Sequence, residues 1–488
     1  MPKTFSKPAT QTCFVLVVTT LCAISCTPQI NSVLKVDGKV GEPLEYRITA
    51  TNSPTSFNAD VPPPEGLGVD TTTGIISGVP EKMGIYKRDI SATNSSGAGQ
   101  PAKLQITIGN AVVVEKELLI IDPQVVQDAN MVGKGKPWHI RTVLQRIAGT
   151  MDDAQVEAFA QAWFALWDDD RKVNAEKYIV PKQPSAAAAM RKAWKDDNIK
   201  LLAIVNRIDL AAGMIAPGQG VGEGRFVYQV IDGLAEKFTF IVEFQLPIAA
   251  GEDRTAALNR WANRWHALGK LEGNDYLKKL AGITADFSAH GNLNQIRTNH
   301  LFNFLLVGWN LREFHFHAPS SRMVQAMTNQ SPDRSHLASA EMKQFITDKE
   351  QDILEGTAGI PLALIGGRSG QGERVEPPGV VARARFIVSF NTCIGCHTGT
   401  ESNIKPFQHI KNFQKGQPAT LSNFMTGEVE TKAKLPSHET SKHNEMMDRR
   451  TLLLHWAEGV KAVPHGVAEA ANQREIDDII RARRFRVH

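Results

Sequence analysis

Cysteine is scarce in this 488-residue chain: there are five, and three of them lie within the first 26 residues. Only Cys393 and Cys396 remain in the body of the protein, too few for a framework of structural disulfides or for a zinc site built from two cysteine pairs. No run of about 18 apolar residues follows the N-terminal segment, so the sequence predicts no membrane-spanning helix in the mature protein. The net charge of +4 comes without a dense basic stripe, which gives no indication of a nucleic-acid partner.

Familiar catalytic motifs are absent from the sequence as well. No H-E-x-x-H, Ser-His-Asp or paired-carboxylate pattern stands out. Residues 366–373 are rich in glycine but lack the lysine of a P-loop, so they predict a flexible loop. Two polar segments are candidate sites, residues 206–209 after a predicted strand and residues 309–317 with alternating polar and aromatic side chains. For both, hydrogen bonding at strand ends and a buried ion pair form the favoured interpretation.

The N-terminal segment has the pattern of an export signal, with two lysines before a short apolar stretch. Residues 23–26, Ala-Ile-Ser-Cys, resemble a bacterial lipobox, although alanine stands where leucine is usual. The resemblance implies removal of residues 1–25, lipid on Cys26 and a tether over residues 26–32. An ordinary signal peptide cut nearby is the alternative. We therefore expect a lipid-anchored protein of the cell envelope, preferably on the outer membrane, facing the periplasm or the exterior.

The most specific motif is Cys-Ile-Gly-Cys-His at residues 393–397. Two thiols at this spacing can each form a thioether to one vinyl group of a porphyrin, and the adjacent imidazole can ligate the iron. A redox-active dithiol and half of a zinc site are the alternatives. Together with the export signal, the motif resembles that of bacterial c-type cytochrome lipoproteins. The resemblance implies one covalent haem c on Cys393 and Cys396, with His397 as the proximal iron ligand.

The second axial ligand of the iron is expected downstream of the motif, as is common in monohaem c-type cytochromes. Met425 and His409 are equally favoured, and methionine ligation would give the higher redox potential. Met446 and Met447 are less favoured because they begin a predicted helix, where methionine more often packs. An open coordination site is a further alternative.

Residues 33–110 alternate apolar and polar residues between turns rich in Gly, Pro, Ser and Thr, which predicts a small antiparallel β-sandwich. Residues 41–44, 50–57 and 73–80 resemble the bacterial Ig-like (cadherin-like) domain, and the last of these contains the pattern G-x-I-x-G-x-P. Some members of that wider fold bind calcium between domains. Because clustered acidic ligands are not evident here, a spacer role is favoured over calcium binding.

Residues 111–385 combine helical and strand patterns, which predicts an α+β domain of unknown role. Helices are expected over residues 151–167, 254–268 and 342–354. Strands are expected over residues 201–205, 225–230, 238–244, 302–307 and 384–388. Residues 386–488 would then form a mainly α haem module, entered directly from the last strand, with helices over 444–458 and 468–484.

The sequence as a whole predicts a multidomain protein: an all-β Ig-like sandwich, a central α+β domain and a C-terminal haem module. The favoured function is that of an exported monohaem c-type cytochrome, which carries single electrons between periplasmic redox partner proteins. One alternative is a haem-dependent oxidoreductase whose substrate binds the central domain. Another is an envelope binding or adhesion protein that uses the Ig-like domain.

Overall fold

The computed structural model of the 488-residue chain divides into two compact units, residues 1–111 and residues 112–488. The structure describes residues 27–39, 43–59, 64, 66–80, 84–109, 112–173, 178–212, 220–232, 237–302, 308–328, 332–354, 358–365, 374–390, 392, 408–426, 429–430, 442–443 and 445–457. Within these ranges no helix is long and apolar enough to cross a membrane.

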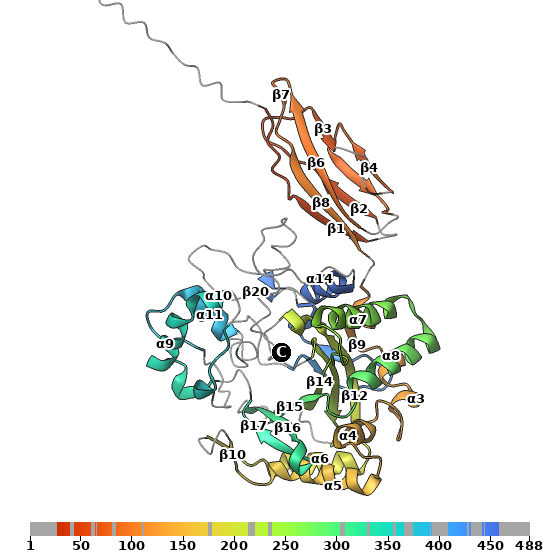
Figure 1. The fold of residues 1–488 in the computed structure, drawn as a ribbon, viewed down its shortest axis with the longest axis vertical. Coiled ribbons are helices and arrows are strands. Elements are labelled where there is room, and N and C mark those ends of the chain that lie inside the picture. The colour runs from red at the N-terminus through yellow and green to blue at the C-terminus, as the bar shows by residue number, and fades with distance from the viewer. Residues whose placement is uncertain are drawn as a thin grey trace, which may run out of the picture. The chain divides into compact units, whose positions relative to one another are not determined.

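The N-terminal unit is a β-sandwich of two sheets (Figure 1). One sheet has the order β1 (Lys35–Lys39), β8 (Ala102–Gly109), β6 (Gly84–Asn94), β3 (Ser56–Ala59), with β7 (Gly97–Ala98) also paired to β6. The other has the order β2 (Leu44–Arg47), β5 (Ile75–Gly78), β4 (Leu67–Asp70). The core between them contains Ile48, Ile76, Ile90, Leu104 and Ile106, each at most 1% exposed. The predicted sandwich is present, but it is not wholly antiparallel, because β1 runs parallel to β8.

The glycine pattern of this unit has a steric reason. Gly78 has φ +143°, and a Cβ placed there would lie 2.1 Å from the backbone oxygen of Gly66. The amide of Val79 donates to that same oxygen at 2.9 Å. Since no side chain fits between the two backbones, the second glycine of G-x-I-x-G-x-P is required at this turn.

The second unit is built on one seven-stranded antiparallel sheet (Figure 1). Its order is β17 (Arg322–Ala326), β16 (Gly308–His317), β15 (Leu293–Phe302), β14 (Lys237–Gln245), β13 (Glu223–Val230), β12 (Ile199–Arg207), β9 (Leu119–Ile120). Neighbours from β12 to β17 follow one another in the chain, so this part of the sheet is a simple meander. The mixed α and β content predicted for the region is confirmed.

One face of the sheet is covered by helices, which are α4 (Ile140–Ala148), α5 (Asp153–Phe164), α6 (Pro184–Lys195), α7 (Arg254–His266) and α8 (Gly273–Phe287). Aromatic rings fill the layer between them: Trp163 lies 5.6 Å from Phe240, and Phe226 lies 5.3 Å from Phe287, between ring centroids. Helix α5 begins where the Asp152 carboxylate accepts from the amide of Gln155, a standard N-cap. Because strand side chains alternate, the residues between these aromatics point to the opposite face.

The remaining elements before the C-terminal part are short. They are α1 (Val114–Glu117), α2 (Pro123–Val126), α3 (Ala129–Val132), η1 (Ala165–Trp167), β10 (Arg171–Val173), β11 (Tyr178–Val180), η2 (Ile208–Ala212), η3 (Ala267–Lys270), η4 (Ala318–Ser320), η5 (Arg334–His336), α9 (Ala340–Asp348), α10 (Glu350–Leu354) and η6 (Leu362–Leu364).

The strand expected over residues 384–388 is wrong, because helix α11 (Ala382–Phe390) occupies this position. Ala384 and Val388 are buried in a cluster with α9, whereas Phe386 is buried in a different cluster against the sheet. The helix is therefore covered on two sides. Ala384, Phe386 and Val388 are all buried, and burial of every second residue is also the pattern of a strand.

The C-terminal elements are β18 (Ile410–Lys411), β19 (Thr420–Leu421), α13 (Asn423–Thr426), β20 (Val429–Glu430), β21 (Lys442–His443) and α14 (Glu445–Ala457). Ile410, Phe424 and Met425 are buried against the second face of the sheet. Leu452 and Leu453 of α14 belong to the main core. The described parts of residues 386–488 thus share their cores with the sheet and do not form the separate module that the sequence predicts. The helix expected over residues 468–484 lies outside the described residues.

Candidate functional site

The predicted haem attachment residues, Cys393, Cys396 and His397, lie outside the described residues, as does Cys26. Among the described residues there is no cluster of three or more His, Cys, Asp or Glu side chains that could hold a metal ion. The haem, lipid and calcium expectations therefore stay predictions. The candidates for the second iron ligand can be located, with the exception of the Met447 side chain, which is not described.

A cavity of about 90 Å³ lies between the second face of the sheet and the C-terminal elements. Its described lining residues are Val205, Arg207, Arg225, Val227, Thr239, Ile241, Glu243, Arg297, Thr298, Asn299, Leu311, His409, Ile410, Phe424, Met425 and Arg449. Most of the sheet residues occupy alternate positions of their strands, which places them on one face. The cavity therefore has an apolar middle and a wall of charged side chains at one end of the sheet.

His409 and Met425, the two favoured ligand candidates, both line this cavity. The short hairpin of β18 and β19 sets their positions, because the Ser422 amide donates to the His409 carbonyl at 2.9 Å. The Ser422 hydroxyl also lies 3.3 Å from Nδ1 of His409, and the imidazole lies 5.0 Å from the Phe424 ring. Met446 is half-buried and packs against the apolar cluster that contains Ile410, Phe424 and Met425.

Residues on both sides of the C-x-x-C-H motif are buried. Thr392, which directly precedes Cys393, is 1% exposed, and its hydroxyl donates to the Ser389 carbonyl at 2.7 Å. Gln408, on the other side, is also 1% exposed. Its amide donates to the carbonyl of Asn299, a cavity-lining residue, at 3.0 Å. Gln408, the first described residue after the motif, is thus bonded directly to a residue that lines the cavity.

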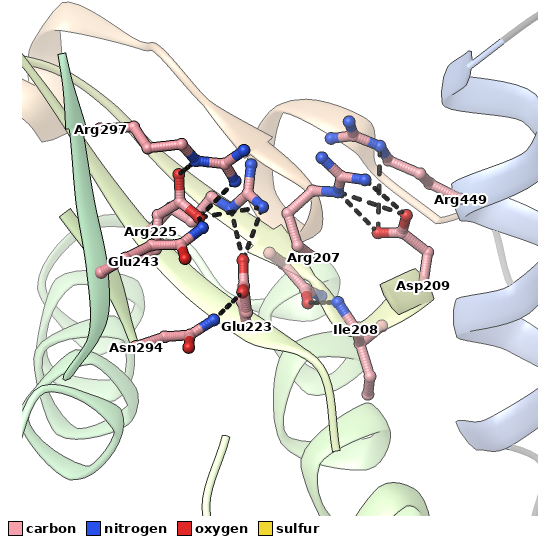
Figure 2. A network of polar contacts seen from close by, with 11 residues as sticks. Arg207, Ile208, Asp209, Glu223, Arg225, Glu243, Asn294, Arg297 and Arg449 are labelled. Carbon is pink, nitrogen blue, oxygen red and sulfur yellow. Dashed lines mark hydrogen bonds and ion pairs between the residues drawn. The ribbon is translucent and has the colours of Figure 1, made fainter. Parts of the chain in front are cut away.

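The charged wall begins with a chain of ion pairs across three strands (Figure 2). Arg225 on β13 donates to Glu223 through Nε at 2.8 Å and through Nη2 at 2.6 Å. The same Nη2 lies 3.4 Å from Oε2 of Glu243 on β14. Arg297 on β15 donates to Glu243 at 2.8 and 2.6 Å, and Gln295 donates to it at 3.0 Å. Each carboxylate is therefore held by fixed donors.

A second group of charges joins the end of β12 to helix α14. Arg207 donates to both oxygens of Asp209 at 3.0 to 3.3 Å. Figure 2 shows Arg449 extending from α14 toward the same carboxylate, with Nε 4.0 Å from Oδ1. Asn206 fixes the turn, since its side chain accepts from the amide of Ile208 at 2.9 Å. The strand-end hydrogen bonds and the buried ion pair that the sequence predicts for residues 206–209 are both present, and Arg207 also lines the cavity.

Residues 309–317 give a similar result where their side chains are described. Glu313 is 2% exposed and its Oε1 lies 2.8 Å from Nε2 of His315. Leu311 lines the cavity, whereas Phe314 lies in the core on the helix side of the sheet. The segment therefore contributes Leu311 to the cavity lining, and its Glu313 and His315 side chains contact each other.

The charges at this wall are stabilised by each other. Burial alone would raise the pKa of Glu243, but the guanidinium groups of Arg225 and Arg297 outweigh it and lower that pKa. Burial opposes the charge on Arg297, and the neighbouring Glu243 carboxylate reverses this, so the pKa of Arg297 is raised. Both groups are therefore ionised at neutral pH.

Sequence reasoning missed most of this wall. Arg225 and Glu243 lie in runs predicted to be strands and Arg449 lies in a predicted helix, whereas Arg297 lies in a segment for which no element was predicted. The available signal was a charged residue inside an otherwise apolar strand, as in Phe-Ile-Val-Glu-Phe at residues 240–244. Such a residue is almost never fully buried unless it is paired.

Comparison with known proteins identifies the N-terminal unit only. The family model described as "Putative Ig domain" matches residues 27–109, so this unit is an Ig-like domain. No curated protein matches the chain.

Solved structures with some similarity include two from Bacteroides fragilis NCTC 9343. A "putative alpha-galactosidase" is 28% identical over 25% of this chain and 24% of its own, with TM-score 0.16. A "putative alpha-galactosidase/melibiase" is 18% identical over 36% of this chain and 37% of its own, with TM-score 0.16. The sialic acid binding region of a Streptococcus sanguinis SK1 adhesin is 11% identical over 70% of this chain and 89% of its own, with TM-score 0.18. At these TM-scores the likenesses carry no argument about function.

Proposed function

We propose that this chain is an exported protein of the cell envelope that carries one haem c and transfers single electrons to and from periplasmic partner proteins. The observation that carries the proposal is the meeting of His409 and Met425 at one cavity, to which the chain returns after the C-x-x-C-H motif. When bound, haem c supplies one-electron Fe(III)/Fe(II) chemistry. The export signal supports the proposal, because c-type haem is attached outside the cytoplasm.

The ligand types at the cavity suit the iron of such a group. Imidazole and thioether side chains are both ligands of haem iron, and both line the cavity. Cys393 and Cys396 would hold the porphyrin and His397 would ligate the iron. The apolar cavity residues Val227 and Ile241 would exclude water from the iron.

Between the two candidates, the surroundings favour His409 as the second ligand. Iron-binding histidines generally place their other ring nitrogen in a hydrogen bond, which fixes the ring. The Ser422 hydroxyl, 3.3 Å from Nδ1, is placed to do so here and would direct Nε2 to the iron. Met425 is 6% exposed and packs in the cluster of Phe386, Ile410 and Phe424, which is the environment of a packing methionine.

The test is expression of the full-length chain with a haem-attachment system, followed by visible spectra before and after acid–acetone extraction. We expect an α band that survives extraction and is lost in the double variant Cys393→Ala, Cys396→Ala. Colour that is fully extracted, or that never forms, would refute the proposal.

The ligand is tested on the same preparation with two matched variants, His409→Ala and Met425→Ala. We expect the wild type to be six-coordinate without a methionine–iron charge-transfer band, and only His409→Ala to lose the sixth ligand. A charge-transfer band that disappears in Met425→Ala would assign Met425 instead. A five-coordinate wild type would favour the oxidoreductase alternative, since a substrate could then reach the iron.

A second candidate function is binding at the cell envelope, which the Ig-like match over residues 27–109 favours. It predicts that the full chain binds isolated cell-envelope polysaccharide or protein, and that Cys393→Ala leaves this binding unchanged. No retention on either material, with correctly folded protein, would count against it.

A further inference from the structure

The charged wall of the cavity presents far more positive than negative groups to the interior. Of the described residues that line the cavity, one is acidic, Glu243, and four are arginines. These arginines are Arg207, Arg225, Arg297 and Arg449. Asp209 and Glu223, which pair with Arg207 and Arg225, are not lining residues. The guanidinium groups are therefore the surface that a ligand in the cavity would meet.

The carboxylates fix these guanidinium groups in place. Asp209 receives two nitrogens of Arg207, and Glu223 receives two of Arg225 while also accepting from Asn294 at 2.6 Å. The four arginine side chains are 2%, 6%, 6% and 4% exposed. Burying several ions together is a weak means of gaining stability, since apolar residues of similar size often do as well. A preorganised set of buried cations beside a cavity is what anion binding requires.

The apolar residues of the cavity indicate which kind of anion would bind there. Val205, Val227, Ile241 and Leu311 form an apolar floor next to the arginines, and Phe424 faces it from the C-terminal elements. Inorganic phosphate has no apolar part to place on such a surface. A carboxylate on a hydrocarbon body does, and it can accept charge-assisted hydrogen bonds from guanidinium N–H groups in addition to the bonds that these arginines already make.

We propose that Arg207, Arg225, Arg297 and Arg449 form a binding site for carboxylate groups carried on an apolar body. Two sources share this chemistry: the propionates of the chain's own haem, which rests on the proposed function, and a free small dicarboxylate. The site itself stands on the described residues in either case.

Arg449→Gln is the test variant, and Arg449→Lys is its matched control. Arg449 is the best position because Asp209 keeps its closer partner Arg207 when Arg449 is lost. Circular dichroism and the urea midpoint show whether the variant is folded. If it is not, Arg225→Lys replaces it, because lysine keeps the charge beside Glu223 but loses the two-nitrogen fork.

The first arm measures the midpoint potential of the haem-loaded full chain. If the site holds propionates, Arg449→Gln lowers the potential, because a lost cation favours the oxidised and more positive haem. Arg449→Lys should leave the potential near that of the wild type. The second arm measures glutarate binding by calorimetry to the haem-free Cys393→Ala, Cys396→Ala chain. If the site takes a free dicarboxylate, Arg449→Gln weakens binding about tenfold, the effect of one charge-assisted hydrogen bond.

The two arms separate the sources. A shifted potential assigns the propionates, and glutarate binding with no shift assigns a free ligand. An unshifted potential together with no glutarate binding would overturn the proposal. If the wild type carries no haem at all, the proposed function fails, and the glutarate arm alone decides the carboxylate site.

Discussion

Replacing Glu243 with glutamine tests the energetics of the charged wall directly. The carboxylate is fully buried and accepts from Arg297 at 2.6 and 2.8 Å and from Gln295 at 3.0 Å, with Arg225 at 3.4 Å. Glutamine keeps the shape but removes the charge that balances two guanidinium groups, each 6% exposed. Breaking a buried ion pair by removing one partner costs about 3–5 kcal/mol. We expect a loss of that size in the free energy of unfolding.

The assay is urea denaturation of the full chain at pH 7, with the slope compared between variants to confirm the same transition. Glu376→Gln is the control, because Glu376 also accepts from an arginine, Arg374, but the two side chains are 55% and 42% exposed. An exposed pair contributes about 0–1 kcal/mol. A Glu243→Gln loss no larger than that of Glu376→Gln would refute the reasoning, since the wall would then not depend on compensated charge.

Three further predictions concern the fold around the site. Tyr228→Phe removes a buried hydroxyl that donates to a carbonyl at 2.9 Å, so we expect a loss of about 1–3 kcal/mol in urea denaturation. Gly224→Ala places a Cβ 2.5 Å from the Phe287 ring, so we expect a loss of about 1–3 kcal/mol and a lower Tm. The Arg260 hydrogen bond lowers the pKa of Glu252 to about 2. Its stabilisation is present above about pH 4.3 and lost as the pH falls to 2, so Glu252→Gln should flatten that part of the stability profile.

Much of the fold could be predicted because the local patterns are strong. The alternation in residues 33–110 and the apolar runs at residues 225–230 and 238–244 correspond to strands of the two units. Helix α11 was missed because a helix buried on both sides shows burial at every second residue, as a strand does. The parallel pairing of β1 with β8 depends on which strands meet, and no local pattern contains that information.

The charged wall could not be predicted for a related reason. Its members lie between residues 207 and 449. The strand residues meet through the sheet register, which pairs Arg225 with Glu243 and places Arg297 beside Ile241, and Arg449 reaches them only because α14 packs nearby. A charged residue in a strand predicts only a solvent-facing position until the burial of both faces is known. Here the second face is covered by the C-terminal elements, which the sequence assigned to a separate module.

That packing links the two halves of the site. The sheet supplies Arg207, Arg225, Arg297 and the apolar floor, whereas the C-terminal elements supply His409, Met425 and Arg449. Asp209 joins them, since it lies at the end of β12 and contacts Arg207 from the sheet and Arg449 from α14. The cavity therefore exists only when the elements that carry His409, Met425 and Arg449 are packed on the sheet. A change that loosens α14 would therefore disturb both His409 and the arginines. Conversely, a ligand that contacts both would stabilise the C-terminal elements against unfolding, because it binds only the folded form.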